Sequence, residues 1–141
     1  MKRTQYAVLV IGCGVAAAAG CGSGRTVGGG DTNTPSNVNF ATQIQPIFNR
    51  NCAITGCHAA DTASQGLVLA EGQAHANLVN VESTEVPPRL RVEPGNSAAS
   101  YLYEKISQAQ PTLGARMPLG SNLPGDEIEL IRVWIDQGAP Q

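Results

Sequence analysis

Two thiols and an imidazole stand close together near the middle of the chain. Cys52 and Cys57 are separated by the four residues AITG, and His58 follows the second cysteine directly. Thiolate and imidazole are ligands that zinc prefers, and paired cysteines also form disulfides in oxidising compartments. This segment is therefore the first candidate for a bound cofactor, a metal ion or a covalent cross-link.

The order of these residues resembles the attachment motif of c-type haem. In that motif two thiols form thioethers with the porphyrin, and the histidine beside the second cysteine ligates iron. The resemblance implies that Cys52 and Cys57 attach one haem and that His58 is its proximal ligand. The motif usually has two residues between its cysteines, so the spacing of four is a departure. We expect Gly56 to let the longer loop fold tightly, with Thr55 and Gly56 bulging outward.

Two other interpretations of the cysteines stay open. A disulfide between Cys52 and Cys57 is compatible with an oxidising compartment. A structural zinc site needs about four ligands, but the only other histidine is His75 and no second cysteine pair stands elsewhere in the chain. Haem attachment accounts best for the adjacency of a thiol and an imidazole, which brings both to one face of the cofactor.

A second axial ligand would have to come from elsewhere in the chain. Met117 is the only methionine left once Met1 is removed with an N-terminal leader. The following Pro118 biases Met117 toward an extended conformation, which suits a loop that presents its sulfur to iron. The alternative for Met117 is a side chain that fills a gap in the core. If His75 were the distal ligand, the haem would have a lower potential, and we expect His75 on the surface instead.

The N-terminal part of the chain has the composition of an export signal. Lys2 and Arg3 precede an apolar run over residues 6–19, which is shorter than the roughly 20 residues of a membrane span. The run ends in AAGC, which resembles the bacterial lipobox and implies that Cys21 is acylated. We expect a lipoprotein signal peptide over residues 1–20, a flexible Gly/Ser/Thr/Asn-rich tether over 21–37 and a folded domain over 38–141.

The alternatives to this anchor are cleavage before Cys13 and a soluble periplasmic product cleaved near Cys21. Acylation at Cys21 would hold an exported, periplasm-facing domain to the membrane through its N-terminus. Gly22 is not the aspartate that retains some lipoproteins at the inner membrane, so we prefer the outer membrane.

Charge and composition exclude several classes of partner. The formal net charge is −2 at pH 7, and removal of the leader leaves seven basic against eleven acidic residues. Such a chain does not attract nucleic acid by its bulk charge. The three glycines at 28–30 lie in a polar spacer and do not follow a strand, so we expect no nucleotide binding.

Apolar spacing predicts three helices and indicates a fourth. A stripe formed by Phe40, Ile44, Ile47 and Phe48 predicts a helix that ends just before Cys52, kinked at Pro46. A second helix is expected after a cap at Asn96 or Ser97, with an inner face of Ala98, Leu102 and Ile106 and with Glu104 exposed. A last helix starts near Pro124 and stops at Gly138, with Ile128, Ile131, Trp134 and Ile135 on its apolar side. A short helix over residues 73–79 is also expected.

Together these segments resemble the single-haem, class I type of cytochrome c, in particular the exported cytochrome-like domains of myxobacteria and planctomycetes. The match covers about residues 40–139 and is carried by IQPIF (44–48), the cysteine motif, LVNV (78–81), VEPGN (92–96) leading to SYL (100–102), and RMP (116–118) followed by WIDQGA (134–139). The resemblance implies an all-α, cytochrome c-like fold of three to four short helices around one covalent haem c. It also implies Met117 as the distal ligand, and we expect Tyr101 and Tyr103 to form the haem-pocket wall and the helix surface.

On this interpretation the protein carries single electrons to and from redox partner proteins and is not a stand-alone enzyme. Ligation of iron by both His58 and Met117 leaves no position for a substrate. Two alternatives remain from the sequence. One is an electron-entry haem module of a larger oxidoreductase, and the other is a haem-free structural lipoprotein stapled by a disulfide between Cys52 and Cys57.

Overall fold

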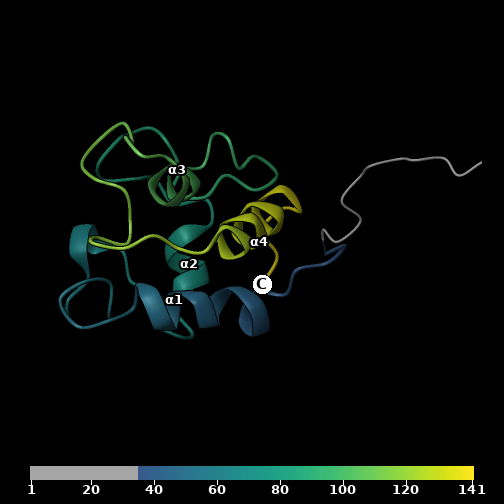
Figure 1. Ribbon diagram of the computed structural model, residues 1–141, viewed down its shortest axis with the longest axis horizontal. Coiled ribbons are helices and arrows are strands. Elements are labelled where there is room, and N and C mark those ends of the chain that lie inside the picture. The colour runs from purple at the N-terminus through teal and green to yellow at the C-terminus, as the bar shows by residue number, and fades with distance from the viewer. Residues whose placement is uncertain (1–34) are drawn as a thin grey trace, which may run out of the picture. The chain divides into compact units, whose positions relative to one another are not determined.

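The computed structural model describes residues 35–141, and within this part the chain is helical and has no β-strand. In chain order the elements are the π-helical turn η1 (Phe40–Ile44), α1 (Gln45–Asn51), the 3₁₀ turn η2 (Ser64–Gly66), α2 (Ala74–Leu78), α3 (Tyr101–Ser107) and α4 (Gly125–Asp136). Figure 1 shows short helices joined by long irregular connections. The prediction of an all-α fold is confirmed.

The predicted signal peptide, the lipidation site at Cys21 and the tether as far as residue 34 lie outside the described residues. Between residues 35 and 141, none of the helices combines the length and the hydrophobicity of a membrane span.

The first helical segment forms where the apolar stripe predicts it. Asn39 caps this segment, because its side-chain oxygen accepts a hydrogen bond from the backbone N–H of Thr42 at 2.9 Å. The first turn is π-helical, and regular α-helix begins one residue before Pro46, which has no N–H to leave unpaired in a first turn. The helix ends as the N–H of Cys52 donates to the carbonyl of Phe48 at 2.8 Å. Helix α1 is therefore followed directly by the segment over residues 52–58, here called the cysteine loop.

Helix α4 corresponds to the predicted last helix. Pro124 is its N-cap residue, and Gly138 follows its end with φ +94°, a conformation that favours glycine. Its apolar side packs against the first helical segment, where the ring centres of Trp134 and Phe40 lie 5.2 Å apart. On the rim of this contact, Arg50 of α1 forms an ion pair of 2.8 Å with Glu127 of α4. The first and last helical segments thus hold each other directly.

Helix α3 starts later than the sequence predicts. Its N-cap residue is Ser100, not Asn96 or Ser97, and Ala98 is exposed before the helix begins. Asn96 closes the preceding turn instead, where its side-chain oxygen accepts a hydrogen bond from the N–H of Ala99 at 3.1 Å. Asparagine favours such turns for the same reason that it favours caps, so the sequence signal was real but one turn early.

Glu104 of α3 is buried, and its predicted exposure is wrong. The side chain is paired with the guanidinium of Arg89, which lies 15 residues earlier in a connection without helix. A buried carboxylate is tolerated only when it is paired or hydrogen-bonded. Helix periodicity carries no information on this partner, which explains the error.

The short helix expected over residues 73–79 is present as α2, and it includes His75. His75 is half-buried, not on the surface, with its ring edge toward Phe40 at 5.1 Å between ring centres. Its Nε2 lies 2.9 Å from the carbonyl oxygen of Ala139. His75 therefore fastens the C-terminal segment over α2.

One apolar core joins η1 and the four α-helices. Its largest fully buried side chains come from the first helical segment, α2 and α4, and they include Ile44, Ile47, Phe48, Leu78, Ile131, Trp134 and Ile135. Helix α3 contributes Ile106, with Leu102 packed against the core. These two side chains also line the cavity described below, so the cavity adjoins the core at α3.

We expect Ile131→Ala to lower the free energy of unfolding by about 2–5 kcal/mol, because it removes a fully buried side chain and leaves a gap in the core. Leu113→Ala, which truncates an exposed side chain of similar size, should change it by less than about 0.5 kcal/mol. Denaturant unfolding of both variants measures the difference. Equal effects would show that α4 does not pack as described.

Candidate functional site

A cavity of about 420 Å³ opens between the cysteine loop, α3 and the 117–121 segment. The predicted site residues Cys52, Cys57, His58 and Met117 all line it. Its volume falls in the range of roughly 300–1,000 Å³ that small-molecule and cofactor sites occupy. The fold thus brings together four side chains that the sequence singled out, while His75 is not among the lining residues.

The cysteine loop is closed by its own backbone. The N–H of Cys57 donates to the carbonyl of Ile54 at 3.0 Å, and the N–H of His58 donates to the carbonyl of Cys52 at 3.1 Å. Gly56 adopts φ +84°, and its N–H donates to the Thr62 hydroxyl at 2.9 Å. Residues 54–56 are exposed, so the extra residues bulge outward as predicted.

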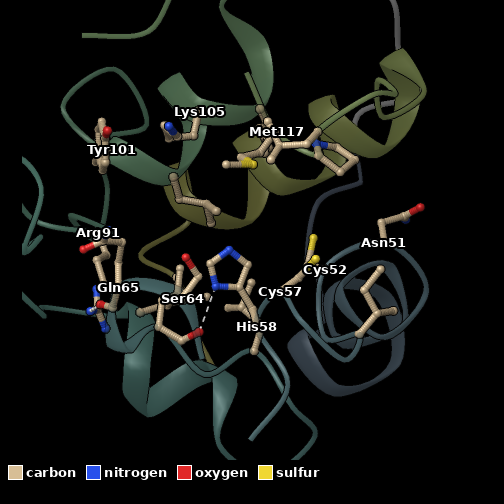
Figure 2. Close-up of a pocket in the computed structure, with 18 of the residues that line it drawn as sticks. Asn51, Cys52, Cys57, His58, Ser64, Gln65, Arg91, Tyr101, Lys105 and Met117 are labelled. Atoms are coloured by element: carbon tan, nitrogen blue, oxygen red, sulfur yellow. Dashed lines mark hydrogen bonds between the residues drawn. The ribbon is translucent and has the colours of Figure 1, made fainter. Parts of the chain in front are cut away.

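His58 is oriented by a hydrogen bond on the ring nitrogen that faces away from the cavity. Its Nδ1 lies 2.9 Å from the carbonyl oxygen of Leu67. Since a carbonyl only accepts, Nδ1 carries the hydrogen, and in the neutral imidazole the lone pair is then on Nε2. In Figure 2 the other ring nitrogen points toward the side of the cavity that holds Met117. Metal-ligating histidines are commonly fixed in this way, with the second nitrogen donating to a carbonyl.

Met117 is held against the end of α3. The last carbonyls of a helix have no partner within the helix and are free to accept other donors. Here the N–H of Met117 donates to the carbonyl of Lys105 at 2.7 Å, and Nε of Arg116 donates to the carbonyl of Ile106 at 2.8 Å. Two successive residues are thus fixed to α3, and Figure 2 shows the Met117 sulfur on the cavity side across from His58.

The segment that leads to Met117 is held by the buried Glu104. Its carboxylate accepts hydrogen bonds from the backbone N–H of Thr112 and from the guanidinium of Arg89. Burial by itself raises the pKa of Glu104, but these bonds outweigh it and lower the pKa to about 2. Glu104 and Arg89 are functional residues that sequence reasoning missed, because neither has a motif around it.

Both cysteines of the loop are free thiols in the structure. Burial raises the pKa of Cys52 to about 12, with smaller contributions from the nearby Cys57 and Glu127. This raised pKa keeps Cys52 mainly in the thiol form at neutral pH. Because the thiolate is the form that exchanges disulfides, burial disfavours thiol exchange through Cys52. Across residues 35–141, no three side chains of His, Cys, Asp or Glu gather in the arrangement of a metal site.

The walls of the cavity combine apolar and polar side chains. The apolar lining includes leucines and an isoleucine, namely Leu67, Leu69, Leu78, Leu102 and Ile106. A thiol pair lies at one end, and Tyr101, Arg91 and Lys105 lie at the other. Arg91 and Lys105 are further residues that the sequence analysis did not identify.

The comparisons with family models, curated proteins and solved structures find no match to this chain.

We expect Glu104→Gln to lower the free energy of unfolding at neutral pH, because the charge that accepts from Arg89 and Thr112 is lost. The folded-state pKa of about 2 lies below the ordinary value of 4.5, so the ionised carboxylate stabilises the fold above pH 4.5. That contribution disappears as the pH falls from 4.5 toward 2. Denaturant unfolding across this range should show the wild type and the variant converging.

The matched control for this experiment is Glu71→Gln, which changes an exposed carboxylate outside the cavity. It should leave both the stability and its dependence on pH almost unchanged. A stability difference for Glu104→Gln that stays constant from pH 7 to pH 2 would contradict the role of its ionised form.

Proposed function

We propose that this protein is a c-type cytochrome that carries single electrons through one covalently bound haem. Cys52 and Cys57 would attach the porphyrin, and His58 and Met117 would be its axial ligands. The observation that carries the proposal is that these four side chains line one largely apolar cavity, with His58 already oriented by the carbonyl of Leu67. The proposed fold is a small, class I-like cytochrome c fold.

The donor set of the cavity supports an iron porphyrin better than a bare metal ion. A porphyrin supplies four nitrogens around its iron, so the protein needs to add only two axial donors. The imidazole Nε2 of His58 and the thioether of Met117 are two such donors on facing sides of the cavity. The thiol of Cys52 could add across a porphyrin vinyl group, with the sulfur bonded to one vinyl carbon and the hydrogen transferred to the other.

When bound, the haem would supply a one-electron couple between ferric and ferrous iron. The chain's own residues determine how that couple behaves. The thioether of Met117 favours ferrous iron relative to a nitrogen ligand, and the apolar walls exclude water from the macrocycle. Because His58 and Met117 are each fixed by backbone hydrogen bonds, the ligand set changes little between the two oxidation states.

If His58 and Met117 both ligate the iron, no position is left for a substrate, and the haem would serve as an electron carrier and not as a catalytic centre. We further propose that the domain is exported as a lipoprotein acylated at Cys21, faces the periplasm and exchanges electrons with partner proteins. The tether over residues 21–37 would let the domain turn toward those partners while its lipid stays in the membrane.

The direct test is to purify the protein from its native, haem-competent host and to record its intact mass and visible spectrum. We expect the mass of one haem added covalently, a signal that survives denaturation in a haem stain, and the spectrum of a six-coordinate c-type haem. The double substitution of Cys52 and Cys57 by Ser should abolish the covalent signal. A colourless wild-type protein without added porphyrin mass would overturn the proposal in favour of a haem-free lipoprotein.

Met117→Ala should lower the reduction potential and allow cyanide or imidazole to bind the ferric protein, because one axial position is opened. Leu113→Ala is the control, since it truncates an exposed side chain in the same 108–124 connection and does not line the cavity. Potentiometry and ligand titration followed by absorbance measure both effects. An unchanged potential together with resistance to cyanide would exclude Met117 as the distal ligand.

A further inference from the structure

The end of the cavity away from the cysteines contains two buried cations. Arg91 and Lys105 both line the cavity, and each is only 8% exposed. In Figure 2 they lie with Tyr101 on the opposite side of His58 from Cys52 and Cys57. A buried charge is costly unless it is paired with an opposite charge, so the surroundings of each cation are informative.

Arg91 has hydrogen-bond acceptors but no counter-ion. Its Nη1 donates to the carbonyl of Asn77 at 2.9 Å, and its Nη2 donates to the carbonyl of Gln65 at 3.1 Å. Among residues 35–141 no carboxylate lies within ion-pair distance of it. Burial lowers the pKa of Arg91, which reflects the cost of this uncompensated charge. The two carbonyls fix the direction of the guanidinium without neutralising it.

Lys105 also has no carboxylate within ion-pair distance among residues 35–141. Its Nζ donates to the carbonyl of Leu113 at 3.0 Å and lies 5.7 Å from the centre of the Tyr101 ring, again without an ion pair. Glu85 is the one carboxylate that lines this end, and it is half-buried. Burial, with Glu85 nearby, raises the pKa of Tyr101 to about 12, so its hydroxyl stays a neutral donor. Two cations against one carboxylate leave this end of the cavity with a net positive charge.

We propose that this end of the cavity binds the two carboxylates of the tetrapyrrole, with Arg91 as the principal charged contact and Lys105 as the second. This inference rests on the proposed function and adds the orientation of the cofactor. A ligand with reactive vinyl groups on one edge and carboxylates on another fits the cavity in one direction, with the vinyl groups at the thiols and the carboxylates at the cations. The bound carboxylates would supply the counter-ions that residues 35–141 do not provide.

The same contacts give Arg91 an influence on the iron. A carboxylate that is paired with a buried cation adds little negative charge near the haem, whereas an unpaired carboxylate favours the ferric form. Removal of the Arg91 charge should therefore lower the reduction potential without changing the axial ligands. A substitution that keeps the charge should preserve most of the wild-type value.

The test uses the haem-loaded protein and compares Arg91→Gln, Arg91→Lys and Arg132→Gln. Arg132 is the matched control, because it is an arginine of α4 outside the cavity that pairs with Glu129 and Asp136. We expect Arg91→Gln to lower the potential and to shift the propionate bending bands in the resonance Raman spectrum. Arg91→Lys should have a smaller effect, and Arg132→Gln should leave both measurements as in the wild type.

A second variant keeps the test decisive if Arg91→Gln does not fold. Lys105→Gln should shift the same propionate bands and lower the potential, since it removes the other cation. If the wild type carries haem but neither variant differs from Arg132→Gln, the carboxylate site is wrong and the proposed cytochrome function stands. If the wild type carries no haem, the proposed function itself fails, and this inference fails with it.

Discussion

A domain this small can keep a cavity of about 420 Å³ beside its core only if its walls are held apart by something other than side-chain packing. An apolar gap favours collapse, because the side chains around it lose contacts that they would regain by moving together. In this structure the walls are held by hydrogen bonds of the connections between helices. The irregular segments around the cavity are therefore the part of the fold on which its shape depends.

The hydrogen bonds that hold the cavity walls apart are made by groups that have no partner within a helix. At the end of α3, the carbonyls of Lys105 and Ile106 accept hydrogen bonds from the N–H of Met117 and from the side chain of Arg116. On the facing wall, the N–H of Leu69 donates to the carbonyl of His58 at 2.9 Å, while the imidazole of His58 binds the carbonyl of Leu67. His58 lies on one wall and Met117 on the other, and backbone hydrogen bonds fix the chain at both residues. Both side chains are therefore already positioned in the ligand-free structure.

The sequence predicted what depends on local order. The first helix and α4 follow from apolar spacing and end signals, and the adjacency of Cys57 and His58 is visible in the chain itself. The left-handed conformation at Gly56 and the outward bulge of the loop also follow from residue type. Local patterns were sufficient here because the residues concerned are neighbours in the sequence.

What the sequence did not predict are the interactions between distant segments. Glu104 was placed on the surface because its partner Arg89 comes from a non-helical connection. The burial of Arg91 was equally invisible, since it depends on the carbonyls of Gln65 and Asn77, 26 and 14 residues away. Backbone carbonyls are present at every residue, so no sequence pattern marks the ones that bind a guanidinium. Charged side chains of this kind are identified only when the fold shows that they face a cavity.

The two ends of the cavity differ in charge, and this difference connects the buried cations to the cysteine loop. At the thiol end, burial and the neighbouring Glu127 disfavour the thiolate of Cys52, so that end accepts neutral groups. At the other end, Arg91 and Lys105 have no ion-pair partner among residues 35–141, so this end favours anions. A ligand held only by axial donors could rotate about the line that joins them, whereas one with a neutral edge and an anionic edge has a single favourable orientation. On the proposed function, the charges at the far end would determine which edge of the tetrapyrrole meets the thiols, so the wider spacing of the cysteines would matter less for specificity.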